Sequence, residues 1–144
     1  MRAGLVAAAL AAGILATPPG ARAEDAIAVV VGRDSAVRTT STDDLREIYL
    51  RRRRVWPDGR AVIPVNLPPD SAVRQRFSRL VLGRDVADLV PYWNARYFEG
   101  VTPPAVLPSP AAVRAYVAAE PSAIGYVPAS EVDETCRTLL VLGR

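Results

Sequence analysis

Apolar and polar positions gather in blocks along the chain, and these blocks predict strands separated by helices. Continuous apolar runs at Ala26–Val31 and Ala123–Val127 are typical of strands buried on both faces. Two further runs, Ala61–Val65 and Thr138–Leu142, bring the predicted strands to four. Pro64 cannot donate a backbone hydrogen bond, so it indicates an edge position or a bulge for its strand.

Helix-start residues precede the first two predicted helices. Ser41 is a good N-cap, and Asp44 three residues later completes an acidic version of the capping box. The helix that starts there is expected to run to about Arg53. Asp70 or Ser71 is expected to cap the second helix.

Two more helices follow before the last strands. Gly83 ends the second helix, Asp85 starts the third, Gly100 ends the third, and Ser109 caps the fourth. The resulting order, with helices between strands, predicts the α/β class with a small, mostly parallel sheet flanked by helices. The expected apolar helix faces are Leu45, Ile48 and Tyr49; Val73, Phe77, Leu80 and Val81; Leu89, Val90, Trp93 and Tyr97; and Val113, Tyr116 and Val117.

The first 23 residues have the pattern of a secretory signal peptide. Arg2 gives a positive start, Leu5–Ala16 is an apolar run, and Ala21–Ala23 supplies the small residues of a cleavage site after Ala23. The apolar run is shorter than the roughly 20 residues of a spanning helix. We therefore expect one α/β domain over residues 24–144, periplasmic or secreted and not membrane-spanning after cleavage; the alternative is an uncleaved anchor.

The composition excludes several kinds of chemistry. The chain has no histidine and one cysteine, Cys136. It therefore lacks the usual general base and the usual metal ligand, so Ser-His-Asp catalysis is excluded and a zinc site is not expected. The acidic residues Asp43, Asp44 and Glu47 lie in the first turns of a helix, where they suit the helix dipole better than acid–base catalysis. We expect no enzyme activity, no metal and no cofactor, and a partly buried thiol near the last strand.

A run of four arginines, Arg51–Arg54, stands out in the sequence. It could indicate nucleic acid, a membrane surface or an acidic partner, but consecutive helical residues point in different directions. Removing the signal peptide also lowers the net charge from +3 to about +1. We predict no nucleic-acid binding and a simple role for the run at a helix C-terminus.

Aromatic side chains offer one further candidate site. Trp56, Tyr92, Trp93 and Tyr97 could line a ligand pocket, but their spacing favours packing between helices and core. Gly125 lies inside a predicted strand and indicates close approach of another element.

Four segments together resemble the substrate-binding proteins of phosphate ABC transporters, and more closely their short, single-lobe relatives. The resemblance spans about Ala26–Pro128 and implies a periplasmic-binding-protein-like fold of the second type. Full-length members clamp the ligand between two lobes, and this chain has room for one, matching mainly the second lobe and the crossing strand. The segments are A-V-V-V-G-R-D with S-T-D-D-L-R-E-I-Y-L, then V-W-P-D-G, then V-I-P-V-N-L-P with S-A-V-R-Q-R-F, then E-P-S-A-I-G-Y-V-P.

The resemblance also implies where a ligand would bind. The family's oxyanion loop typically reads R-x-D-G-S-G-T-x, and the aligned stretch here is L-P-P-D-S-A-V-R. Ser71 keeps its place, whereas the arginine, the second glycine and the threonine are replaced. The implied ligand-binding residues are Asn66, Asp70, Ser71, Arg74 and Tyr126. The alternative is that Asp70 and Ser71 only cap a helix, with Arg74 in solvent.

Two functions follow as expectations. The first is an exported, non-enzymatic binding protein for phosphate or another small oxyanion in ABC transport. The second is a ligand-free module, built on one lobe, that binds another envelope or transporter protein. A homodimer that rebuilds a two-lobed cleft is compatible with either.

Overall fold

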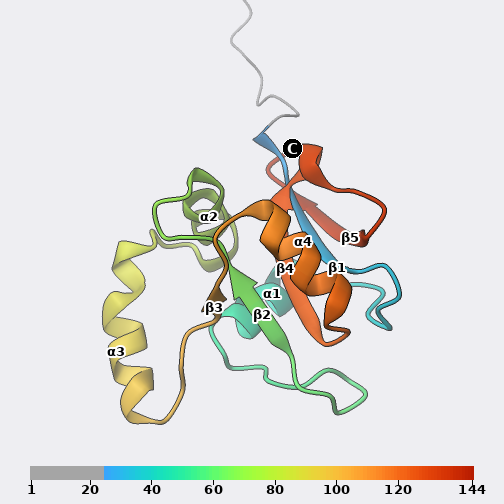
Figure 1. Cartoon of the computed structure of the whole chain (residues 1–144). Coiled ribbons are helices and arrows are strands. Elements are labelled where there is room, and N and C mark those ends of the chain that lie inside the picture. Colours follow the sequence, from blue (N-terminus) through green and yellow to red (C-terminus); the bar gives the residue numbers. More distant parts are fainter. Residues whose placement is uncertain (1–24) are drawn as a thin grey trace, which may run out of the picture.

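The computed structural model of the protein describes residues 25–144, in which five strands form one mixed sheet (Figure 1). The order across the sheet is β3-β2-β4-β1-β5, and helices flank it, which confirms the predicted α/β class. The predicted signal peptide lies outside the described residues. The strands are β1 (Ile27–Gly32), β2 (Ile63–Asn66), β3 (Ala105–Val106), β4 (Ala123–Pro128) and β5 (Cys136–Leu142).

Strand direction sets β1 apart from the other four strands. β2 pairs in parallel with β3 and β4, whereas β1 pairs antiparallel with both β4 and β5. Four strands therefore run one way, as a mostly parallel sheet requires, and β1 runs against them. Every residue of β1 is buried, as its apolar run predicts, because a strand flanks it on each side.

Three of the predicted helix caps are present. The Ser41 Oγ accepts the Asp44 N–H at 3.0 Å while the Asp44 carboxylate accepts the Ser41 N–H at 3.3 Å, a reciprocal capping box. Ser71 and Ser109 cap the second and fourth helices by accepting the Arg74 and Ala112 N–H groups, without the reciprocal bond. The helical elements are α1 (Thr42–Tyr49), α2 (Ala72–Phe77), η2 (Ser78–Leu82), η3 (Ala87–Leu89), α3 (Val90–Phe98), α4 (Pro110–Ala119) and η4 (Ala129–Glu131).

Helices cover both faces of the sheet (Figure 1). Gly125 of β4 faces α4, where a Cβ would lie 2.6 Å from the Val113 Cγ1, so only glycine fits without displacing that side chain. The next residue, Tyr126, points to the opposite face and contacts Tyr49 of α1 and Phe77 of α2. The expected close packing at Gly125 is confirmed.

The first helix ends at Tyr49, so the predicted extension to Arg53 is wrong. Arg51 adopts a left-handed conformation with φ of 59°, and its N–H donates to the Ile48 carbonyl at 3.0 Å. The Arg52 N–H donates to the Glu47 carbonyl at 2.9 Å. These two bonds form a Schellman motif, which closes the helix without glycine.

The arginine run therefore forms a turn after α1 instead of one side of a helix. Arg52 pairs with Glu47 at 3.2 Å and Arg53 with Asp44 at 2.7 Å, both near the surface. Arg51 donates to the Val62 carbonyl at 3.2 Å, which ties the turn to the segment entering β2. The run serves the local structure, as its position at a helix C-terminus predicts.

The proline in β2 does not mark an edge strand, because β2 lies between β3 and β4. The Ile63 N–H donates toward β4, so the nitrogen of Pro64 faces the β3 side. Pairing with β3 begins only at Val65, so no ladder bond is lost at Pro64. Pro64 therefore costs the sheet no hydrogen bond, although its strand is not at the edge as predicted.

The third helix is more exposed than its sequence predicts. Leu89 is buried as expected, but Val90 and Tyr97 are 55% and 68% exposed, and α3 contains no buried residue. Leu80 and Tyr116 are also exposed, contrary to prediction. Figure 1 shows α3 standing beside the rest of the fold, beyond the β3 edge.

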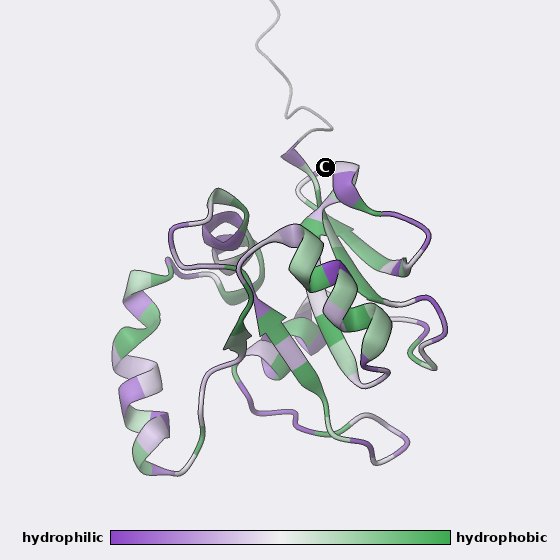
Figure 2. Cartoon of the chain, in the orientation of Figure 1, coloured by the Kyte–Doolittle hydropathy of each residue, from purple (hydrophilic) through white to green (hydrophobic). Residues whose placement is uncertain are grey.

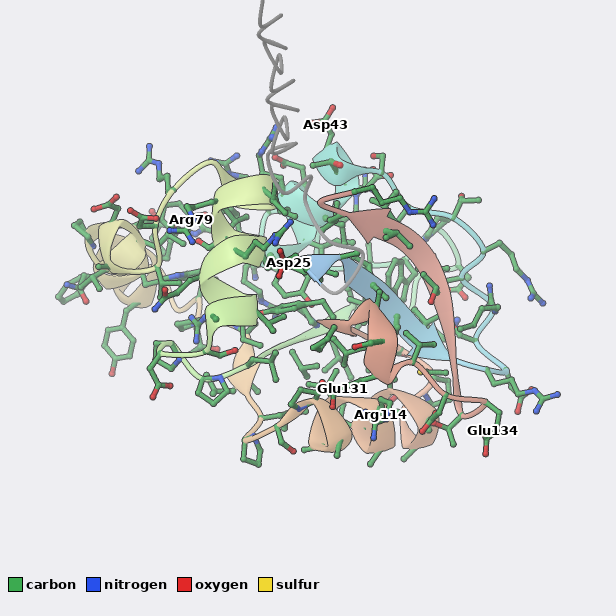
Figure 3. All side chains as sticks on the ribbon, turned by 90° about the horizontal axis from the view of Figure 1, so that it is seen from above. Asp25, Asp43, Arg79, Arg114, Glu131 and Glu134 are labelled. Carbon is green, nitrogen blue, oxygen red and sulfur yellow. The ribbon has the colours of Figure 1, made fainter. Side chains whose placement is uncertain are left out.

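The core lies between the sheet and its flanking helices. Apolar residues follow the central strands, and hydrophilic residues follow the connecting loops (Figure 2). Trp56 and Cys136 are buried, the latter as the first residue of β5, which confirms the expected position of the thiol. Arg114 of α4 extends toward Glu131 and pairs with it at 3.8 Å (Figure 3).

Candidate functional site

The predicted ligand-binding residues lie at the carboxyl ends of neighbouring parallel strands. Asn66 ends β2, and the loop that follows leads to Ser71 at the start of α2. Tyr126 lies on the adjacent strand β4 and reaches Asn66. In open α/β sheets, the crevice outside the carboxyl strand ends is the usual place for a ligand. The fold therefore positions these residues where a small molecule could be held.

A buried hydrogen-bond network joins β2 to β4. The Tyr126 hydroxyl donates to Asn66 Oδ1 at 2.9 Å and accepts the Leu67 N–H at 3.4 Å. Both Asn66 and Tyr126 are buried. Burial raises the pKa of Tyr126 well above its ordinary value, although the Leu67 N–H and the Arg74 charge oppose the rise. The phenol is therefore a neutral donor at physiological pH.

Aromatic packing fixes the ring of Tyr126. Phe77 stacks on it with ring centroids 3.8 Å apart, and Tyr49 meets Phe77 edge-on at 4.8 Å. The Tyr49 hydroxyl donates to the Val65 carbonyl at 3.0 Å, and burial raises the pKa of Tyr49 as well. Tyr49 and Phe77 were predicted as core positions from helical spacing. Their convergence on Tyr126 depends on the tertiary fold, which spacing does not reveal.

Arg74 brings a positive charge to this edge of the sheet. Its Nη1 donates to the Leu67 carbonyl at 3.0 Å, which draws the side chain back over the loop instead of leaving it in solvent. Burial lowers the pKa of Arg74, and the nearby Tyr126 opposes that effect. Within residues 25–144, Arg74 forms no ion pair with a carboxylate. A half-buried cation without a counter-ion favours binding of an anion.

The remaining predicted residues differ in their contribution. Ser71 Oγ accepts the Arg74 N–H at 3.4 Å, so its hydroxyl oxygen serves the helix start. Asp70 is exposed and makes no hydrogen bond to another described residue. The structure thus brings Asn66, Arg74 and Tyr126 together, joins Ser71 to them only through its cap bond to Arg74, and leaves Asp70 outside the network.

The space enclosed by these side chains is small. A cavity of about 20 Å³ is lined by Asn66, Arg74, Tyr49 and Phe77, with Trp93 at one wall. Such a volume accommodates about one water molecule. A tetrahedral oxyanion is too large for it, so any such ligand would have to lie on the outer side of Arg74.

The alternative aromatic pocket does not form. Trp56 is buried in the loop between α1 and β2 and donates through Nε1 to the Ser122 carbonyl at 3.0 Å. Tyr92 donates to the Leu50 carbonyl at 2.7 Å, and Tyr97 lies in solvent. These side chains do not surround a common space.

The described part of the chain offers neither a metal site nor a membrane-spanning helix. No group of three or more acidic, cysteine or histidine side chains in residues 25–144 is arranged to hold a metal ion. None of the helices described there combines the length and apolarity needed to cross a bilayer.

The single mixed sheet, its flanking helices and the polar residues at the carboxyl strand ends define the architectural class. It is an α/β fold with one mixed sheet between helices, in which β1 is the single strand that runs against the others.

Solved structures of phosphate-transport receptors share this fold. A phosphate ABC transporter substrate-binding protein with bound phosphate from Clostridium perfringens matches at a TM-score of 0.64 and 19% identity, over 78% of this chain and 43% of that chain. An ABC-type phosphate transport receptor from Vibrio cholerae matches at 0.64 and 20%, over 78% and 44%. PstS from Borrelia burgdorferi matches at 0.53 and 14%, over 71% and 40%.

These likenesses confirm the predicted resemblance at the level of the fold. The chain spans less than half the length of the proteins it matches. No protein-family model matches the sequence, and no curated protein matches it either.

Proposed function

We propose that the protein is an exported, non-enzymatic binding protein that holds phosphate or another small oxyanion at the carboxyl edge of its sheet and works with an ABC transporter. Export rests on the predicted signal peptide, and the absence of histidine from the sequence supports a role without catalysis. Phosphate is the ligand of the similar protein from Clostridium perfringens, which makes it the first ligand to test.

The observation that carries this proposal is the state of Arg74. Its guanidinium is half-buried, Nη1 is fixed by the Leu67 carbonyl, and Nε and Nη2 make no hydrogen bond to residues 25–144. A guanidinium held in one orientation can offer two donors to two oxygens of an oxyanion. The ligand would contact the outer side of Arg74, because the cavity behind it holds only about one water.

Thermal denaturation with and without phosphate or sulfate tests this function. A ligand present at 100 times its dissociation constant should raise the free energy of unfolding by about 2.7 kcal/mol. We expect stabilisation of the wild-type protein and its loss in Arg74→Gln. Arg79→Gln is the matched control, because Arg79 lies in the same helical segment and its ion pair with Asp85 is exposed.

Two results of this experiment would contradict the proposal. Equal stabilisation of Arg74→Gln and the wild type would reject Arg74 as the binding residue. No stabilisation of the wild type by any oxyanion would reject oxyanion binding altogether.

A second function is favoured by one observation. The C-terminal end of α3 presents Tyr97 and Phe98, which are 68% and 89% exposed, and edge-on contact between their rings forms a small aromatic surface. Aromatic side chains of this kind are enriched at protein interfaces. This surface supports the alternative of a module that binds an envelope protein.

Sedimentation velocity and capture from an envelope extract distinguish this alternative. It predicts a complex that is lost in Tyr97→Ser/Phe98→Ser and kept in Arg74→Gln. A monomer without a partner in both experiments would count against it.

A further inference from the structure

A second cavity lies at the amino ends of the parallel strands, opposite to the end where Arg74 lies. Its volume is about 430 Å³, within the range typical of sites for small organic ligands. One wall is formed by residues 36–40, in the loop after β1. The other is formed by residues 53–60, in the loop before β2. Figure 1 shows these two loops at the right and bottom of the view, away from α2 and the start of α4. The cavity is therefore separate from the candidate oxyanion site.

The floor of this cavity is apolar. Trp56, which is 6% exposed, and the fully buried Ile48 of α1 lie at its floor, and Val37 and Pro57 supply accessible apolar surface at the walls. The Trp56 ring is held in place by its Nε1 bond to the Ser122 carbonyl. A rigid indole beside an isoleucine favours contact with an apolar or aromatic body.

The walls carry more positive than negative charge. Arg53 is paired with Asp44 at 2.7 Å, and Arg60 with Asp58 at 2.8 Å, so each carboxylate already has a partner. Arg38 lines the cavity and forms no ion pair within residues 25–144.

Polar groups of Arg60, Thr39 and Thr40 also border the cavity. The Nη2 of Arg60 is shielded from solvent and has no hydrogen-bond partner among the described residues, which is costly for a guanidinium nitrogen. The side chains of Thr39 and Thr40 line the same wall as Arg38. The accessible donors for an anion are Arg38 and Thr39, because Arg60 Nη2 is shielded and the Thr40 hydroxyl donates to the Ser41 carbonyl at 3.5 Å.

We propose that this cavity binds a small organic monocarboxylate, with its apolar body against Val37 and Pro57 beside Trp56 and its carboxylate at Arg38. One unpaired lining cation matches one negative charge, which favours a monoanion over a polyanion or a cation. The apolar floor separates this ligand class from inorganic phosphate, which has no apolar part.

Titration with benzoate, followed by NMR of the indole N–H groups, tests the proposal on the folded protein. The chain has two tryptophans, so the Trp93→Phe variant assigns the two resonances. We expect benzoate to shift the Trp56 resonance saturably and to leave the Trp93 resonance nearly unchanged. Benzamide has the same shape without the charge and should bind about tenfold more weakly, as loss of a charge-assisted contact implies.

Two variants complete the test. Arg38→Gln should weaken benzoate binding about tenfold, whereas Arg84→Gln, an exposed arginine outside the cavity, should leave it unchanged. Arg74→Gln should also leave it unchanged, which separates this site from the proposed oxyanion site. The proposal is overturned by the absence of a saturable Trp56 shift, by equal binding of benzoate and benzamide, or by unaltered binding in Arg38→Gln.

Discussion

The hydroxyl of Tyr126 serves two polar groups in the interior, the Asn66 side chain and the Leu67 N–H. Removing it leaves Asn66 Oδ1 without a donor, because water has little access there. We expect Tyr126→Phe to lower the free energy of unfolding by about 1–3 kcal/mol, as measured by urea denaturation. Tyr116→Phe removes a hydroxyl from a more exposed ring and should change it by less than about 0.5 kcal/mol. Similar losses in both variants would contradict the buried network.

Two buried tyrosines make stability depend on alkaline pH. Burial raises the pKa values of Tyr49 and Tyr126 in the folded protein, so above the unfolded value of about 10 the folded state binds more protons than the unfolded state. Stability is therefore intact below about pH 10 and falls above it, by about 1.4 kcal/mol per pH unit for each tyrosine.

Urea denaturation between about pH 9 and pH 11.5 measures this dependence. The slope should become shallower in Tyr126→Phe, which retains only the contribution of Tyr49. An unchanged slope in that variant would show that Tyr126 ionises equally in both states.

At the residue scale, the sequence predicted most residues of the proposed site but not the hydrogen bonds that join them. Asn66, Arg74 and Tyr126 were expected near a ligand, and the fold does bring them together. The sequence could not show that the Tyr126 hydroxyl would donate to Asn66. It also could not show that the Leu67 N–H and carbonyl would bond to Tyr126 and Arg74. The two contacts of Tyr126 join residues about 60 positions apart, and periodicity carries no information at that range.

Among the secondary-structure elements, the contact between β4 and α4 depends on Gly125. A Cβ there would lie 2.6 Å from the Val113 Cγ1 and 3.1 Å from the Val65 Cγ2. We expect Gly125→Ala to destabilise the protein by about 1–3 kcal/mol through overpacking, measured by urea denaturation.

A double variant provides the control for this prediction. Val113→Ala removes the clashing methyl group, so Gly125→Ala/Val113→Ala should be more stable than the sum of the single effects predicts. Simple additivity would show that the cost of Gly125→Ala has another origin.

Element boundaries show where local signals suffice. Ser41, Ser71 and Ser109 cap helices as predicted, because a cap depends on a few neighbouring residues. The end of α1 was missed because Arg51 takes a left-handed conformation that sequence usually reserves for glycine. β3 was missed because Ala105–Val106 is too short to show strand periodicity. These two residues are a strand because they pair with β2.

For the whole molecule, the main feature is one sheet with a proposed binding site at each end of its parallel strands. The proposed oxyanion site lies at the carboxyl ends of β2 and β4, and the proposed carboxylate cavity lies at their amino ends. The similar solved proteins are more than twice as long as the region that matches this chain.

Mapping phosphate binding by NMR tests oxyanion binding at Arg74 most directly. Phosphate should shift the Arg74 Nε–H resonance and the amide resonances of Ser71 and Arg74 saturably, and leave the Trp56 indole resonance unchanged. Shifts confined to other parts of the protein, or no saturable shift at Arg74, would contradict the proposed function.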